Sequence, residues 1–292
     1  WNKYVLAETL DAAIEALALG GRSARIIAGG TDLILEMERG VRPGINTLID
    51  VTKITGVDRI YEDQDGVIHL GPLVTHNHVV ASQLIREKAF ALLQACWEVG
   101  SPQIRNRGTV AGNLVTASPA NDTISPLMAL NAGLKLRSVR GERTVPLSDF
   151  YLGVRKTVLE PDEMITDIFF NALKPGQHSY YIKSALRRAQ AISVINISVV
   201  VEINAGLIQD AQITLGAAAP TIIHADSAEK SMIGKTLDDQ LIREVAKLIE
   251  EAARPISDIR GSADYRSYMM GVIGKRALSA IKTGVNKDEI PT

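Results

Sequence analysis

The sequence predicts an α+β fold of two to three domains, and three observations predict that class. A chain of 292 residues is longer than one ordinary hydrophobic core organises. Helix and strand patterns are mixed through the first 176 residues. The last third instead places two apolar strand patterns before two helix patterns, the order typical of a sheet with helices laid on one face.

The N-terminal elements form a small unit of helix and strands. Residues 8–19 predict an amphipathic helix that Thr9 caps and the glycine pair at 20–21 ends. Residues 24–28 predict a buried strand, and residues 48–51 predict a second short strand. The apolar stripe of the helix consists of Leu10, Ile14 and Leu17.

A second unit begins with a strand predicted over residues 67–70. Helices are predicted over 79–85 and 92–99, and the alternating pattern of 134–139 predicts a half-buried strand. Lys174-Pro175-Gly176 is the strongest boundary signal in the middle of the chain.

The last third begins with strands predicted over 192–203 and 207–216. Helices follow over 241–253 and 265–282. The predicted domains are therefore 1–176, with subdomains of about 1–56 and 57–176, and 177–292.

Composition excludes several classes of function. A net charge of −1 provides no positive field to attract nucleic acid, and with 4% aromatic residues the chain has few side chains on which bases could stack. The single cysteine, Cys96, lies in an apolar stretch and predicts a buried packing residue rather than a disulfide. With no apolar run of 18 residues, we expect no transmembrane segment and a cytoplasmic protein.

Two glycine turns are the most informative motifs. The first is Ala28-Gly-Gly-Thr-Asp-Leu33, directly after the buried strand, and the second is Thr109-Val-Ala-Gly-Asn-Leu114. Glycine lets backbone approach a phosphate closely, and successive N–H groups form an anion nest. Each turn alone is compatible with an ordinary loop. Together they predict a diphosphate held from both sides.

Other nucleotide and metal motifs are absent or incomplete. No Gly-x-Gly-x-x-Gly follows a strand, so a Rossmann site is not indicated. Gly234-Lys235-Thr236 resembles the end of a P-loop, but Glu229 occupies the position of its first glycine. His76 and His78 have the spacing of a metal pair without further ligands nearby, which favours solvated or hydrogen-bonded histidines.

Two charged groups have open interpretations. Glu36, Glu38 and Arg39 are best explained as a solvated helix face. Lys183 and the pair Arg187-Arg188 are predicted on a strand entering the last domain. They either face an anionic or electron-rich ring or are surface charges on an edge strand.

With both turns in place, the chain resembles the FAD-binding medium subunit of the molybdenum hydroxylases, the family of xanthine dehydrogenase and aerobic carbon monoxide dehydrogenase. The resemblance covers essentially the whole chain. It is carried by residues 26–33, 100–114, 116–122, 183–188 with 191–193, and 257–260 with 265–266.

The resemblance implies a fold and a set of site residues. The fold is the FAD-binding fold of the vanillyl-alcohol-oxidase/PCMH type, with two α+β subdomains, followed by a C-terminal α+β domain of the CO dehydrogenase flavoprotein type. By similarity, the two turns hold the diphosphate, Thr116 and Asp122 extend the site toward ribose and adenine, Ile165 packs near the adenine, and Lys183 lies beside the isoalloxazine. The implied cofactor-binding residues are Ile26, Ile27, Ala28, Gly29, Gly30, Thr31, Asp32, Leu33, Thr109, Val110, Ala111, Gly112, Asn113, Thr116, Asp122, Ile165 and Lys183.

Two positions depart from the family pattern. Gln190 stands where some relatives carry an acidic residue facing the flavin, which leaves its effect on the flavin potential open. Ala111 stands where many relatives have glycine, so a negative φ is required there.

The resemblance also implies a function. The chain is expected to be an oxidoreductase subunit that carries FAD and passes electrons from [2Fe–2S] clusters of a small partner subunit to NAD, a quinone or another acceptor. A large molybdopterin subunit completes the complex, as a dimer of heterotrimers. No residue of this chain is expected to catalyse hydroxylation, and the substrate of the complex stays open. The alternatives are a self-contained flavin-dependent oxidoreductase and a flavin-free interaction subunit.

Overall fold

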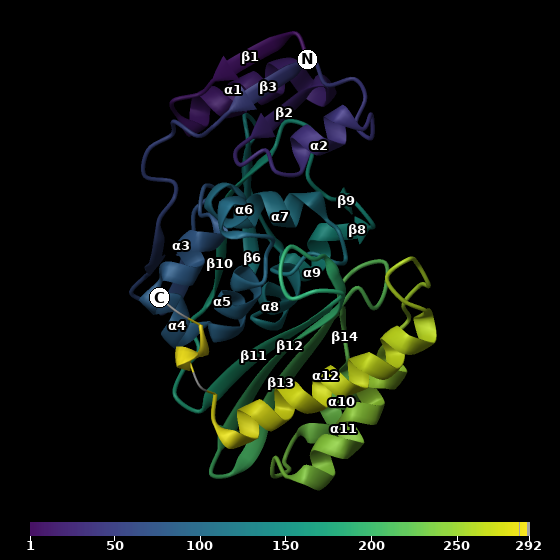
Figure 1. The fold of residues 1–292 in the computed structure, drawn as a ribbon. Helices are drawn as coiled ribbons and strands as arrows, with labels where there is room; N and C mark the ends of the chain where they lie inside the picture. Colours follow the sequence, from purple (N-terminus) through teal and green to yellow (C-terminus); the bar gives the residue numbers. More distant parts are fainter. Residues whose placement is uncertain (286, 291–292) are drawn as a thin grey trace.

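The computed structural model describes residues 1–285 and 287–290, and it begins with a small parallel sheet. The strand order is β1-β3-β2, drawn in purple in Figure 1. The elements of this unit are β1 (Lys3–Leu6), α1 (Leu10–Gly20), η1 (Gly21–Ser23), β2 (Ala24–Ile27), α2 (Leu33–Glu38) and β3 (Thr47–Asp50).

The sequence signals for α1 are confirmed. Thr9 caps the helix by accepting a hydrogen bond from the Ala12 N–H at 3.1 Å. Ile14 and Leu17 are buried against the sheet, and Gly21, with φ of +49°, ends the helix in a backbone conformation that glycine favours.

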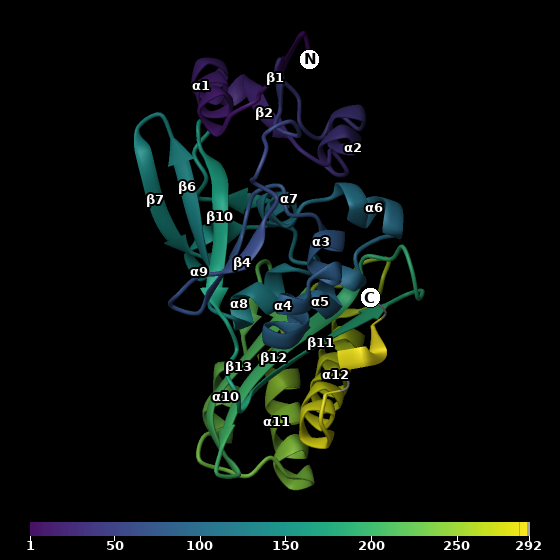
Figure 2. The same cartoon turned by 90° about the vertical axis from the view of Figure 1, so that its left-hand side faces the viewer.

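The second sheet is antiparallel and five-stranded, in the order β4-β5-β10-β6-β7. Helices α5 and α8 lie between it and the C-terminal third (Figure 2). The elements are β4 (Ile60–Glu62), β5 (Val67–Leu70), α3 (His76–Ala81), α4 (Gln83–Lys88), α5 (Phe90–Trp97), α6 (Pro102–Arg107), α7 (Val110–Thr116), α8 (Ile124–Ala129), β6 (Gly133–Ser138), β7 (Gly141–Pro146), α9 (Leu147–Phe150), β8 (Tyr151–Gly153), β9 (Lys156–Thr157) and β10 (Met164–Asn171).

The helix predicted over 79–85 is in fact two helices. Ser82 has an extended backbone (φ −81°, ψ 115°), and its hydroxyl accepts from the Ile85 N–H, so it caps a new helix. Serine competes for backbone hydrogen bonds in this way, and the periodicity of apolar residues does not register the break.

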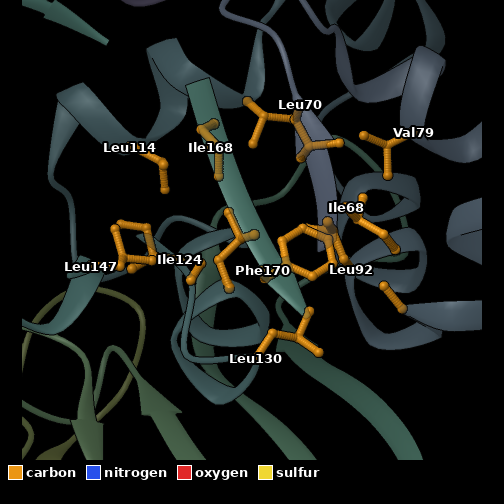
Figure 3. Close-up of a cluster of buried hydrophobic side chains, with 14 of the residues drawn as sticks. Ile68, Leu70, Val79, Leu92, Leu114, Ile124, Leu130, Leu147, Ile168 and Phe170 are labelled. Carbon is orange, nitrogen blue, oxygen red and sulfur yellow. The ribbon is translucent and has the colours of Figure 1, made fainter. Parts of the chain in front are cut away.

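The core of this region packs the five-stranded sheet against the helices. Figure 3 shows Ile68 and Leu70 from β5 and Phe170 from β10 meeting the helical side chain Leu92. All are almost completely buried. Cys96 lies in the same cluster as a free thiol, as predicted, and burial raises its pKa.

The C-terminal third is a four-stranded antiparallel sheet, β11-β12-β13-β14, with helices α11 and α12 on one face (Figures 1 and 2). The sequence predicts helices on one face of this sheet only. In the structure, α5 and α8 also pack on the other face. Burial on both faces explains why β12 is buried without a break over 193–201, at polar positions such as Asn196 and Ser198 as well as at apolar ones. The elements are β11 (Gln177–Ala185), β12 (Ser193–Asn204), β13 (Leu207–Gly216), β14 (Ile223–His224), α10 (Asp226–Met232), α11 (Asp239–Ala252), α12 (Ala263–Thr283) and η2 (Lys287–Glu289).

The predicted boundary at 176/177 falls in the segment between β10 and β11. The division into domains stays a prediction, and 286 and 291–292 of its last domain lie outside the described residues. Within the described part of the chain, no helix is long and apolar enough to cross a membrane.

Candidate cofactor site

A cavity of about 860 Å³ lies where the three-stranded sheet, helices α6 and α7, and the segment before β12 meet. Its lining contains every predicted site residue except Val110 and Lys183. The two glycine turns, about eighty residues apart in sequence, therefore contribute to one cavity. Its volume lies in the upper part of the range of ligand pockets.

The first turn is packed directly on backbone that leads into the second. A Cβ on Gly29 would lie 2.1 Å from the carbonyl oxygen of Arg107 and 3.0 Å from the Cα of Gly108. Gly30 adopts φ of +70°, which also favours glycine. Gly29 is thus required for contact between the two turns of the protein as well as for any close contact with a ligand.

The backbone donors of the first turn are available to a ligand. Within the described part of the chain, the N–H groups of 29–33 donate no hydrogen bond, while the next N–H, that of Ile34, donates to the Gly30 oxygen at 3.1 Å. A run of unpaired N–H groups at a cavity wall has the donor chemistry of an anion nest.

The backbone donors of the second turn are partly used within the protein. The Gly112 N–H donates to the Thr109 hydroxyl at 3.0 Å, and the Val110 N–H donates to the Val74 oxygen at 2.9 Å. These hydrogen bonds cap α7 and join it to the preceding loop, and the contact of this turn with a diphosphate stays a prediction. Ala111 lies inside α7 and, as its methyl group requires, is absent from the positive-φ residues.

The Asn113 side chain fixes the far end of the second turn. Its Oδ1 accepts a hydrogen bond from the Thr123 hydroxyl at 2.6 Å. Its backbone oxygen accepts from the Asn121 amide, also at 2.6 Å. The turn is therefore held by the segment that leads to Asp122.

Asp122 is a fully buried carboxylate with three side-chain donors. It accepts from Tyr181 (2.8 Å), Ser193 (2.7 Å) and Lys183 (2.8 Å). Burial raises the pKa of Asp122, and the Lys183 ammonium opposes that shift. Lys183 also donates to the Glu98 oxygen at 2.9 Å and does not line the cavity. Its contact with a flavin ring stays a prediction.

One end of the cavity carries charged side chains. Glu36 is buried and forms ion pairs with Arg42 and Arg155, so its prediction as part of a solvated helix face was wrong. Glu38 and Arg39 are exposed, as predicted. Partial loss of hydration, followed by repulsion from Glu36, raises the pKa of Asp32.

The segment 190–192 closes the opposite wall. Gln190 has φ of +51°, unusual for a residue with a side chain, and its N–H donates to the Gly100 oxygen at 3.1 Å. Arg187 donates to the Gln190 oxygen at 3.0 Å. Arg187 and Arg188 lie beyond the end of β11, so their placement on a strand was wrong. Both side chains are exposed.

Arg155 and His76 are among the cavity residues that sequence reasoning did not assign to the site. Arg155 pairs with Glu36 and has φ of +57°, which no pattern indicated. His76 lines the cavity at the first position of α3, where it is buried and its Nδ1 has no hydrogen-bond partner. The expectation of a solvated or hydrogen-bonded side chain was wrong for His76 and right for His78, which is exposed and accepts from the Thr75 N–H. The described residues contain no group of three or more potential metal ligands.

Comparison with known proteins assigns the chain to a family. Residues 2–171 match the family described as the FAD binding domain in molybdopterin dehydrogenase. The chain belongs to this family. Residues 180–281 match the CO dehydrogenase flavoprotein C-terminal domain. The chain is thus an FAD-binding oxidoreductase subunit of the molybdenum hydroxylase type, and the predicted resemblance, fold class and FAD cofactor are confirmed.

Relatives match over nearly the whole chain. The nicotinate dehydrogenase FAD-subunit of Eubacterium barkeri is 34% identical over 256 residues, 86% of each chain. The carbon monoxide dehydrogenase medium chain of Hydrogenophaga pseudoflava is 29% identical over 95% of this chain and 96% of its own. Reconstituted CO dehydrogenase from Oligotropha carboxidovorans superposes with a TM-score of 0.92 at 28% identity, covering 97% of this chain and 98% of that one.

The residues in the cavity fit FAD. The unpaired N–H groups of 29–33 supply donors for a diphosphate, and the apolar side chains of Ile27 and Ile165 supply walls for flat rings. Glu36 pairs with both Arg42 and Arg155, and its single negative charge offsets only one of their two positive charges.

Proposed function

We propose that this chain carries FAD in the cavity between its two glycine turns and passes electrons from the [2Fe–2S] clusters of a partner subunit to NAD, a quinone or another acceptor. The observation that carries the proposal is the run of unpaired N–H groups over 29–33 beside the second turn. Bound FAD supplies one- and two-electron redox chemistry. The residues of this chain bind and orient it.

The proposed assignments follow the position of each group. Residues 26–33 and 109–113 hold the diphosphate, with Val110 supporting α7 from the core rather than touching the ligand. Thr116 and Ile165 extend the site along the cavity wall. Asp122 has its donors on Tyr181, Ser193 and Lys183, so we assign it to shaping the cavity wall and to holding Lys183 in reach of the ring.

The proposed partners are a small iron–sulfur subunit and a large molybdopterin subunit, in a dimer of heterotrimers. The family assignment supports this, since the relatives in Hydrogenophaga pseudoflava and Paenarthrobacter nicotinovorans are named as a medium chain and a medium subunit. A cytoplasmic location stays a prediction.

Purification of the tagged chain from its host tests the proposal. We expect FAD to be released by heat, and iron, molybdenum and two further polypeptides to co-purify in constant ratio. FAD without the other subunits, together with turnover of small alcohols, would support a self-contained oxidoreductase. A colourless protein would contradict the flavin assignment and favour an interaction subunit.

A further inference from the structure

His76 makes no side-chain hydrogen bond in the described structure, although it is only 2% exposed. A neutral imidazole has one N–H donor and one acceptor, and a buried polar group without a partner destabilises the folded state. Buried polar groups of this kind call for an explanation such as a water molecule or a ligand. No sequence pattern requires a histidine at this position, because apolar side chains of α3 already supply its packing contacts.

The ring lies at the junction of the two glycine turns. The backbone N–H of His76 donates to the backbone oxygen of Gly108 at 3.1 Å. This hydrogen bond anchors the start of α3 to the backbone just before the second turn. A Cβ on Gly108 would lie 3.3 Å from Cδ2 and 3.5 Å from Nε2 of His76. Gly108 is also the residue whose Cα a Cβ on Gly29 would approach. Gly29, Gly108 and the imidazole are therefore consecutive neighbours in the cavity wall.

The state of the ring restricts what it can bind. Burial, with a smaller contribution from the Arg105 cation, lowers the pKa of His76 to about 4. The side chain is therefore neutral near pH 7 and contributes one directed N–H rather than a charge. Arg105 is itself engaged, donating to the Trp97 oxygen at 2.9 Å and to the Asn77 side chain at 3.1 Å.

We propose that His76 is a cofactor-binding residue that donates an imidazole N–H to the diphosphate of bound FAD. The proposal rests on the proposed function, since it takes the two glycine turns as the diphosphate site. An oxygen of the diphosphate accepts hydrogen bonds and offers none, so it matches the donor of a neutral ring. The donating atom is Nε2, the ring nitrogen on the Gly108 side, because Nδ1 is enclosed by protein and stays without a partner.

The test compares His76→Phe with wild type in the purified full-length chain freed of flavin. Phenylalanine keeps a ring of similar shape and removes both nitrogen atoms. Because a hydrogen bond to a charged acceptor is lost, we expect the Kd for FAD, followed by flavin fluorescence, to rise about 10- to 100-fold. The Kd for ADP, which contains the diphosphate, should rise by a similar factor, and that for riboflavin should not change.

The stability of the flavin-free protein gives a second readout. Because the substitution removes an unpartnered polar group, the melting temperature of flavin-free His76→Phe should equal or exceed that of wild type. A purely structural histidine predicts the opposite. The control is His78→Gln, which keeps an acceptor at the third position of α3 and should change neither quantity.

Two results would overturn the proposal while leaving the proposed function intact. One is wild-type FAD affinity in both His76→Phe and His76→Ala. The other is an equal loss of riboflavin and ADP affinity together with a lower melting temperature, which would make His76 a packing residue. Failure of the proposed function is distinguishable, because the wild-type chain itself would then bind no FAD.

Discussion

At the scale of single residues, the site depends on glycine at positions where a side chain would collide with neighbouring backbone. Gly29 is predicted from its glycine pair, and its packing adds a role that the sequence does not suggest. A Cβ at this position would lie 2.1 Å from the Arg107 oxygen, so only glycine allows the first turn to pack on the backbone that leads into the second. Contact with a phosphate is then a consequence of how those turns are placed.

The substitution Gly29→Ala tests this role. The added methyl group meets backbone that cannot rotate away, so we expect the turns to separate. Overpacking of this kind costs about 1–3 kcal/mol of unfolding free energy, and FAD affinity should fall at least 10-fold because the donors of 29–33 move. Urea unfolding and flavin fluorescence measure the two effects.

Gly261→Ala is the matched control. Its Cβ would lie 3.2 Å from the ring of Tyr265, a side chain that can adjust, and Gly261 does not line the cavity. Equal losses of unfolding free energy and FAD affinity in the two variants would show that the effect of Gly29→Ala does not come from the contact between the turns.

Sequence patterns located both turns because glycine and threonine leave a local signature. They could not reveal the donors to Asp122, which come from Tyr181, Lys183 and Ser193, 59 to 71 positions away. They could not reveal the missing partner of His76 either, since that is a property of the packed site. Local sequence patterns therefore locate a turn, whereas the hydrogen-bond partners of its side chains are set by tertiary contacts.

At the scale of elements, Lys183 joins β11 to the helical region. Its ammonium binds Asp122, in the segment before α8, and the carbonyl oxygen of Glu98, just after α5. With 3% of the Lys183 side chain exposed and Asp122 buried, this pair is shielded from solvent. Removing one member of such a pair leaves the other charge uncompensated.

We therefore expect Lys183→Met to lower the unfolding free energy of the flavin-free chain by about 3 kcal/mol. The double variant with Asp122→Asn should recover part of this loss, because the buried charge is removed as well. Urea unfolding of the four proteins gives the coupling energy. Strictly additive losses would show that the two side chains act independently.

The contact between β14 and α10 depends on pH. His224 pairs with Glu229 at 2.9 Å, and this hydrogen bond raises the pKa of His224 above its usual 6.5. A raised folded pKa means that the stabilisation is complete below pH 6.5 and is lost as the pH rises through the folded value. Partial exposure of the imidazole keeps the effect small, within about 1 kcal/mol.

Thermal unfolding between pH 6 and 9 checks this expectation. The difference in stability between wild type and His224→Gln should shrink as the pH rises through that window. His178→Gln, on β11 at the opposite edge of the sheet, is the control and should show no such trend. A difference that grows with pH would contradict the assigned ion pair.

Six of the fourteen described strands and the two long C-terminal helices could be predicted because their patterns are local. The strand over 207–216 has the predicted bounds. The break at Ser82 and the second helical cover of the last sheet could not be predicted. The first depends on a serine cap, and the second on α5 and α8 from elsewhere in the chain.

At the scale of the whole molecule, the cavity has walls from four parts of the chain. Residues 26–33 come from the first sheet, 108–113 from the helical region, 155–165 from the segment that leads into β10, and 190–192 from the segment before β12. A ligand that contacts all four stabilises their arrangement. The proposed partners and electron acceptor have no comparable local signal in the sequence.

Bound FAD should therefore raise the stability of the whole chain. At a free concentration 100 times its Kd, the expected gain is about 2.7 kcal/mol, visible as a concentration-dependent rise in melting temperature. Riboflavin, which lacks the diphosphate, should give a smaller rise at the same concentration. An identical rise with both ligands would argue that the glycine turns do not hold the diphosphate.

The most direct test of the central claim is a crystal structure of the full-length chain with FAD bound. The account predicts electron density for the diphosphate between the two turns, with its oxygens within hydrogen-bond distance of the N–H groups of 29–33. Density for the diphosphate elsewhere, with these N–H groups facing water, would contradict it.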